Sequence, residues 1–182
     1  PRPVLPGDHQ IENAGTAIAA LRTLGLDASA CEAAVTQATW PARMQRLSRG
    51  PLAKTATAAG AELWLDGGHN PAAGAAIAHT LAQLPPRDTA VICGMLNTKD
   101  TAGFLAPIAA QAQTLYAVAI PGEKNTQDPA DVIKAAEATG LTAHAAETVA
   151  GALESILAAT PHARVLICGS LYLAGQVLAE NG

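Results

Sequence analysis

The sequence predicts an α/β fold with a mostly parallel sheet, and three observations support that class. Short apolar runs that suit buried strands, such as residues 89–93 and 164–168, alternate with alanine-rich segments that suit helices. Glycine and proline separate most of these segments. Hydrophobic residues make up 49% of the 182 residues but aromatic residues only 3%, so the core is built from small aliphatic side chains that suit helix-on-sheet packing.

Two helices are expected in the first 39 residues. Asp8 is a candidate N-cap, an apolar stripe follows it at spacings of three and four, and Gly25 ends the first helix. The second helix has a candidate capping box, which pairs Ser29 with Glu32 three residues later.

The helical pattern breaks at Pro41, because a proline disfavours helix at the preceding residue, and residues 44–47 can begin a strand. We therefore predict one domain segment over 1–39 and a second over 40–182.

Within 40–182 strands and helices alternate as in βαβ units. The expected elements are a strand at 61–66, a helix at 71–84, a strand at 89–93, a helix at 100–112 kinked at Pro107, a strand at 115–120, a helix that Asp128 caps and Gly140 ends, a short strand near 142, a helix at 149–159, a strand at 164–168 and a helix from 171.

Composition and charge exclude several classes of protein. The net charge is -4 without a long run of either sign, which favours a small-molecule ligand over nucleic acid or an anionic membrane. Apolar runs fall short of the ~20 residues of a spanning helix, and residues 1–7 lack a signal-peptide layout, so we expect a cytoplasmic protein. Cys31, Cys93 and Cys168 show no C-x-x-C spacing and are expected to be reduced core thiols rather than zinc ligands.

The most informative segment is L-W-L-D-G-G-H-N-P at 63–71. It combines a buried strand, a glycine turn and a helix start, with Asn70 as N-cap and Pro71 as the first helical residue. Asp66 and His69 then stand at the carboxyl end of a strand, which is the edge of an open α/β sheet where ligands bind.

Two further strand ends carry polar or glycine-rich turns, at 94–100 and 169–170. In a parallel sheet all three turns lie on the same edge. The polar side chains expected there are Asp66, His69, Asn97, Lys99, Asp100 and Ser170. These groups can bind hydroxyls, an amino group and carboxylates, but no G-x-x-x-x-G-K-[ST] or G-x-G-x-x-G motif is present to cradle a triphosphate.

Five motifs in their order and spacing identify a family resemblance. They are H-Q-I-E-N-A at 9–14, W-P-A-R-M at 40–44, D-G-G-H-N-P at 66–71, G-M-L-N-T-K-D at 94–100 and V-L-I-C-G-S-L-Y-L-A-G at 165–175. The chain resembles folylpolyglutamate synthase, including the bacterial dihydrofolate synthase form, in the Mur ligase superfamily. The resemblance implies the tail of an ATPase domain up to about Thr39, followed by a Rossmann-like three-layer carboxyl-terminal domain.

The implied reaction transfers the γ-phosphate of ATP to a carboxylate of a folate or dihydropteroate. The amino group of L-glutamate then attacks the acyl phosphate to form an amide. ATP and magnesium are the implied cofactors. The family's P-loop and metal ligands lie upstream of the matching portion, so we expect an ATPase domain as partner. We expect the 182-residue chain to be an inactive monomer with at most millimolar ATP affinity.

The resemblance also implies roles for individual residues. Asn13 corresponds to an adenine contact, Arg43 to a phosphate contact at the domain hinge, and Asp66 to a ribose contact. His69 corresponds to a residue beside the nucleotide and the reaction centre, so Arg43 and His69 are the catalytic candidates.

Lys99 and Ser170 match positions that hold the carboxylate of the incoming amino acid in the wider superfamily. The chain departs from the family pattern at two positions. Ala42 stands where glycine is customary before the arginine, and Gly68 stands where alanine is customary in D-G-A-H-N-P.

Structural alternatives exist for each assignment. Turn or cap roles suit Asp66, Asn70 and Ser170, and solvent-exposed roles suit Asn13, Arg43 and Lys99. Packing rather than base stacking is expected for Trp40 and Trp64. The alternative functions are a non-catalytic nucleotide-binding Rossmann-like module and another Mur-type amino-acid ligase domain.

Overall fold

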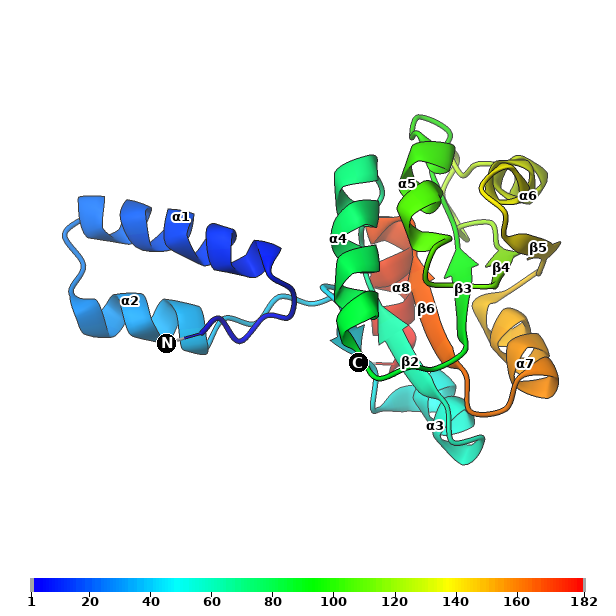
Figure 1. Cartoon of the computed structure of the whole chain (residues 1–182), viewed down its shortest axis with the longest axis horizontal. Helices are drawn as coiled ribbons and strands as arrows, with labels where there is room; N and C mark the ends of the chain where they lie inside the picture. Colours follow the sequence, from blue (N-terminus) through cyan, green and yellow to red (C-terminus); the bar gives the residue numbers. More distant parts are fainter. Residues whose placement is uncertain (1, 182) are drawn as a thin grey trace.

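The computed structural model describes residues 2–181 and contains a helix pair beside an α/β domain (Figure 1). The pair is α1 (His9–Thr23) and α2 (Ala28–Thr36). The α/β domain contains β1 (Gln45–Arg46), α3 (Gly50–Ala58), β2 (Glu62–Leu65), α4 (Pro71–Gln83), β3 (Thr89–Cys93), α5 (Thr101–Ile108), β4 (Thr114–Ala117), α6 (Pro129–Ala138), β5 (Thr142–Ala145), α7 (Val149–Ala159), β6 (Arg164–Cys168) and α8 (Leu171–Asn181).

The six strands form one sheet in the order β1-β2-β6-β3-β4-β5. All neighbours pair in parallel except β1, which runs antiparallel to β2 with Gln45 opposite Leu65. The late strand β6 inserts between β2 and β3, so Val165 lies opposite both Leu63 and Ala90. The predicted mostly parallel sheet is confirmed.

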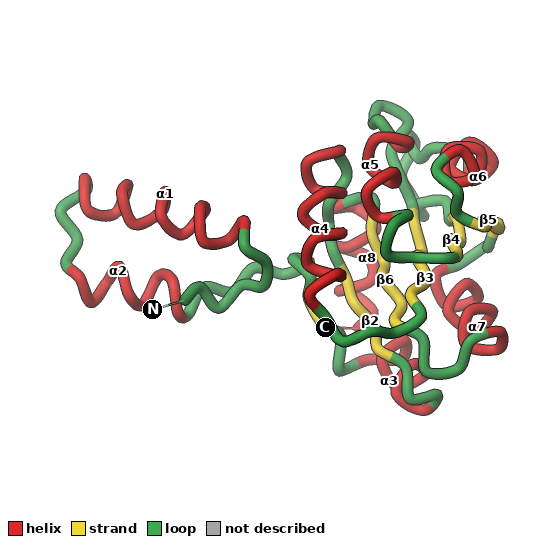
Figure 2. Tube along the Cα trace, in the orientation of Figure 1, coloured by secondary structure: helices red, strands yellow, loops and turns green. Residues whose placement is uncertain are grey.

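Helices cover both faces of this sheet, which gives three layers (Figure 2). Buried side chains of α3, α7 and α8 share one core cluster, and those of α4, α5 and α6 share the other. All five residues of β3 and all five of β6 are buried. Their continuous apolar runs therefore reflect burial on both sides, and the Rossmann-like three-layer expectation is confirmed.

Helix α3 is an element that the sequence pattern did not predict. Gly50 has a φ of 83° and begins the helix immediately before Pro51. The residue before it, Arg49, provides no side-chain cap. The cap comes instead from the other end of the chain, where Asn181 Oδ1 accepts a hydrogen bond of 2.9 Å from Leu52 N.

Two predicted helix caps are wrong. Asp27, not Ser29, caps α2, because its Oδ1 accepts the Ala30 amide at 2.8 Å and Ser29 lies within the helix. Asp8 makes no side-chain cap at α1. Its carboxylate instead accepts hydrogen bonds from His79 Nε2 at 3.0 Å and Gln83 Nε2 at 3.1 Å, which ties the helix pair to α4.

Two predicted elements end earlier than expected. Helix α5 stops at Ile108 rather than at residue 112, and Pro107 lies inside its last turn. Strand β4 ends at Ala117, although Val118 and Ile120 beyond it remain buried.

The three cysteines are free and buried, as predicted. Cys93 and Cys168 lie opposite each other in the register of β3 and β6. A hydrogen bond with Cys93, together with burial, raises the pKa of Cys168 well above its usual value, so this thiol stays neutral. Within residues 2–181, the helices are all too short or too polar to cross a bilayer.

Candidate functional site

The carboxyl ends of β2, β6 and β3 form one continuous edge, as the three strand-end turns predicted. Backbone hydrogen bonds join the turns that follow these strands. Gly169 N donates to Gly68 O at 3.0 Å, and Gly94 N donates to Cys168 O at 3.2 Å. The turns are therefore held in a fixed order, with the β6 turn between the other two.

Asp66 lies at the end of β2 and is only 5% exposed. Its Oδ1 accepts a hydrogen bond from Gly68 N at 2.7 Å, and its Oδ2 accepts one from Met44 N at 2.8 Å. Burial raises the pKa of Asp66, although the two amide hydrogen bonds and the charge of Arg43 oppose the shift. The carboxylate thus links the strand-end turn to the segment that leads from the helix pair.

His69 is half-buried in the same turn, and its Nδ1 lies 3.0 Å from Gly67 O. Because a carbonyl only accepts, Nδ1 carries the proton, which leaves Nε2 as the nitrogen available to a ligand. Asn70 caps α4 by accepting the Ala73 amide at 2.9 Å, with Pro71 at the first turn, as predicted.

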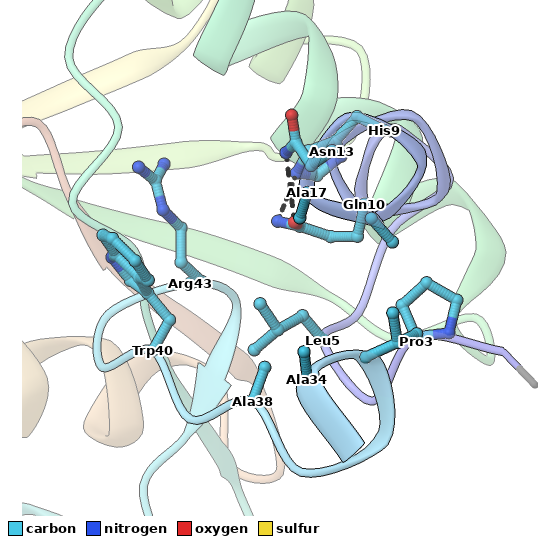
Figure 3. Close-up of a pocket in the computed structure, with 12 residues that line it drawn as sticks. Pro3, Leu5, His9, Gln10, Asn13, Ala17, Ala34, Ala38, Trp40 and Arg43 are labelled. Atoms are coloured by element: carbon cyan, nitrogen blue, oxygen red, sulfur yellow. Dashed lines mark hydrogen bonds between the residues drawn. The ribbon is translucent and has the colours of Figure 1, made fainter. Parts of the chain in front are cut away.

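A cavity of about 430 Å³ lies where α1, α2 and the segment before β1 meet (Figure 3). Its walls are mostly apolar. The residues that line it are Pro3, Leu5, His9, Gln10, Asn13, Ala14, Ala17, Ala34, Val35, Ala38, Trp40 and Arg43. The cavity brings together Asn13 and Arg43, two predicted nucleotide contacts that are 30 positions apart in the sequence.

The Asn13 amide is oriented by a short hydrogen-bonded chain (Figure 3). Asn13 Nδ2 donates to Gln10 Oε1 at 3.1 Å, and Gln10 Nε2 donates to His9 Nε2 at 2.9 Å. Asn13 keeps its Oδ1 and a second N–H, a pair that can bind adenine in two hydrogen bonds. Sequence reasoning left the roles of His9 and Gln10 open. The three-residue spacing from Gln10 to Asn13 on a helix was the available signal.

Trp40 lines the same cavity and is 61% exposed, so the packing predicted for it is not observed. Figure 3 shows it on the same side of the cavity as Arg43, with His9 and Asn13 on the opposite side. Trp64 is partly buried against the core, as predicted.

Lys99 and Ser170 lie apart from this cavity, at neighbouring strand ends. Lys99 is exposed in the turn after β3. Ser170 is 2% exposed, and its Oγ accepts the Tyr172 amide at 3.0 Å at the start of α8. This contact is the N-cap role that was the structural alternative for Ser170. Within residues 2–181, no three His, Cys, Asp or Glu side chains cluster closely enough to hold a metal ion.

Comparisons with known proteins show the family to which this chain belongs. Residues 43–171 match the family model described as the Mur ligase, glutamate ligase domain. The chain is 31% identical over 138 residues to the folylpolyglutamate synthase of Lacticaseibacillus casei, covering 76% of this chain and 29% of that protein. It is 29% identical over 187 residues to the dihydrofolate synthase/folylpolyglutamate synthase of Escherichia coli, covering 98% and 39%.

Solved structures agree with this assignment. Mycobacterium tuberculosis folylpolyglutamate synthase complexed with ADP and AMPPCP superposes with a TM-score of 0.79 at 28% identity, covering 97% of this chain and 41% of that one. Escherichia coli FolC in complex with DHPP and ADP gives a TM-score of 0.78 at 26% identity, covering 98% and 40%.

The fold and the matched segment define a glutamate ligase domain, and the chain belongs to the Mur ligase family. Within that family it corresponds to the carboxyl-terminal part of folylpolyglutamate and dihydrofolate synthases. It spans about two fifths or less of the length of these relatives.

Proposed function

We propose that the chain is the carboxyl-terminal part of an ATP-dependent ligase that adds L-glutamate to a folate or dihydropteroate. Residues 1–39 are the tail of the ATPase domain, and residues 40–182 are the glutamate ligase domain. The ATPase domain contributes the P-loop and the magnesium ligands. The chain alone is then inactive and binds ATP at most in the millimolar range.

The meeting of Asn13 and Arg43 in one cavity is the observation on which this proposal depends. An amide that can pair with a base and a guanidinium that can bind phosphate line the same space. Relatives of this chain have been solved with ADP, with AMPPCP, and with Mn, AMPPNP and L-glutamate. The same ligand classes are proposed here.

In this proposal the residues of the cavity and those of the turn after β2 contact different parts of the nucleotide. Asn13 binds the adenine, Arg43 binds phosphates, and Asp66 accepts hydrogen bonds from the ribose on the lone pairs that its two backbone amides leave free. His69 faces the reaction centre through Nε2. Arg43 stabilises the negative charge that develops as the phosphoryl group is transferred, because a guanidinium matches phosphate oxygens in geometry and charge.

Glutamate recognition is assigned to the neighbouring strand ends. The Lys99 ammonium supplies charge for the glutamate carboxylate. The Ser170 hydroxyl accepts from Tyr172 N but still has its own proton to donate. The alternative functions are a non-catalytic nucleotide-binding module and a Mur-type ligase that uses another amino acid, because one fold can carry different functions.

Kinetics of the complete ligase, in which an ATPase domain accompanies this chain, test the proposal. Arg43→Ala should lower kcat roughly 10- to 100-fold, the equivalent of one charge-assisted hydrogen bond, while leaving the unfolding midpoint near that of the wild type. Arg43→Lys should restore part of the activity if two guanidinium nitrogens are used. Full activity of Arg43→Ala would contradict the phosphate role.

The glutamate assignment has its own kinetic signature. Lys99→Ala and Ser170→Ala should each raise the KM for L-glutamate and leave the KM for ATP nearly unchanged. Lys124→Ala, a change of an exposed lysine in another loop, serves as the control. Unchanged glutamate KM in both variants would leave Lys99 as a solvated lysine and Ser170 as a helix cap.

A further inference from the structure

Arg43 projects from a backbone turn of unusual conformation. The residues on either side of it both have positive φ, 55° at Ala42 and 39° at Met44. Residues with a Cβ rarely adopt this left-handed region, so neighbouring contacts must hold the turn in place. Those contacts therefore fix the position of the Arg43 backbone, from which its side chain extends.

Three hydrogen bonds hold the turn. Ala42 N donates to Gln45 Oε1 at 2.9 Å, and Ala42 O accepts from Gly67 N at 2.9 Å. Met44 N donates to Asp66 Oδ2 at 2.8 Å. Two of these bonds reach the β2 turn, while the third comes from a side chain only three residues away.

The two flanking side chains anchor the turn in opposite layers. Ala42 is 4% exposed and belongs to the core cluster of α3, α7 and α8, whereas Met44 is 3% exposed and belongs to that of α4, α5 and α6. Arg43, between them, is half-buried and lines the cavity that Asn13 also lines. Of these three residues, Arg43 is therefore the one whose side chain can reach a ligand.

We propose that Gln45 is a positioning residue that acts through Arg43, by fixing the Ala42 amide in the left-handed turn. The inference rests on the proposed role of Arg43 in binding nucleotide phosphates. Gln45 is the appropriate residue to test because, within residues 2–181, its amide oxygen accepts from the backbone amide of Ala42 alone, whereas Asp66 is itself a proposed ribose contact. Loss of the Gln45 acceptor frees the turn and scatters the guanidinium, without removing any group that touches nucleotide.

Two variants of the 182-residue chain distinguish the effect of the Gln45 hydrogen-bond acceptor from that of the rest of the Gln45 side chain. Gln45→Met keeps the length but removes the oxygen, and Gln45→Glu keeps an oxygen that can accept from Ala42 N. In the ligand-free protein, the backbone amide order parameter of Arg43 should stay near the rigid value of about 0.85 in the wild type and Gln45→Glu. It should fall clearly below that value in Gln45→Met.

Nucleotide titrations followed by NMR give the functional readout. Gln45→Met should bind ADP about fivefold more weakly than the wild type, the effect of one neutral hydrogen bond, and adenosine equally well because adenosine lacks phosphates. In an Arg43→Ala background the same change should have no effect on ADP affinity.

An unchanged Arg43 order parameter in Gln45→Met would overturn the positioning role, whatever the nucleotide affinities are. So would equal weakening of ADP and adenosine, or an undiminished effect of Gln45→Met in the Arg43→Ala background. If Arg43→Ala itself leaves ADP affinity unchanged, the proposed phosphate contact fails instead, and the order parameter still decides whether Gln45 holds the turn.

Discussion

Asp66 illustrates how one residue can satisfy both a structural and a functional interpretation. Its position at the end of β2 predicted a ligand contact, and the structure adds two backbone amides that its carboxylate accepts. Each carboxylate oxygen has a further lone pair that can accept a hydrogen bond from a ribose hydroxyl. The ribose contact stays a prediction. The burial of this charge nevertheless has a consequence for stability.

We expect the stability difference between wild type and Asp66→Asn to depend on pH. Burial raises the folded-state pKa of Asp66 above its ordinary value of 3.8. Below pH 3.8 the carboxyl is protonated in both states. As pH rises from there through the folded pKa, the unfolded state loses its proton first, so the wild type should lose stability relative to the variant. Urea unfolding at a series of pH values measures this difference. A wild type that gains relative stability over this range would show that the amide hydrogen bonds outweigh burial.

Gly68 is a second residue whose surroundings explain its identity. A Cβ there would lie 2.9 Å from Asp66 Oδ1, 2.9 Å from Ile77 Cδ1 and 3.0 Å from Ala73 Cβ. The alanine that is customary in the family motif therefore conflicts with the present neighbours, one of which is the end of the Ile77 side chain.

Gly68→Ala should destabilise the fold by about 1–3 kcal/mol, the usual cost of overpacking. Ile77→Val removes Cδ1 and should recover part of that loss when combined with Gly68→Ala, although Ile77→Val alone is destabilising. Denaturant unfolding of the three variants measures the coupling. Strictly additive effects would contradict the proposed clash.

The sequence identified the polar residues of the sheet edge and, through the family resemblance, Asn13 and Arg43 in the cavity, but not the other residues that line it. Gln10 and Trp40 were missed for different reasons. Gln10 Oε1 accepts a hydrogen bond from Asn13 Nδ2, a contact that the three-residue spacing on a predicted helix could have indicated. Trp40 was expected to pack, as tryptophan side chains usually do, yet it lies exposed in the segment between α2 and β1.

Helices and strands were predicted correctly where a single local sequence pattern was strong. Continuous apolar runs predicted β3 and β6. Helix α6 was predicted from Asp128-Pro129 at its start and Gly140 after its end. Helix α3 was missed because Arg49-Gly50-Pro51 resembles a turn. Its cap comes from Asn181, 129 positions from Leu52, and no local pattern can contain it.

Asn181→Ala should destabilise the domain by about 1–2 kcal/mol, the usual cost of losing a helix cap. Asn181 Oδ1 binds Leu52 N, and its Nδ2 donates to Val177 O at 2.9 Å, so both ends of the amide are used. Glu180→Ala, at an exposed position of the same helix, is the control. Equal unfolding midpoints for the two variants would show that Asn181 contributes little to α3.

In the whole molecule, the helix pair and the α/β domain meet at few points. Asp8 binds α4 through His79 and Gln83, and the segment that joins α2 to β1 connects the helix pair to the α/β domain (Figure 1). The cavity that Asn13 and Arg43 share lies at this junction. Several large apolar side chains on or beside the helix pair are exposed, namely Val4, Ile11, Leu24 and Leu26. Their exposure is consistent with the proposal that these helices belong to an ATPase domain.

The most direct test of the account is an ADP titration of the 182-residue chain, followed through the side-chain NMR signals of Asn13 Nδ2 and Arg43 Nε. Both signals should shift together with one dissociation constant in the millimolar range, and Asn13→Ala and Arg43→Ala should each weaken binding. Adenosine should shift the Asn13 signal and leave that of Arg43 nearly unchanged. ADP shifts that are confined to other loops, or affinities that neither variant alters, would contradict the assignment of this cavity to nucleotide.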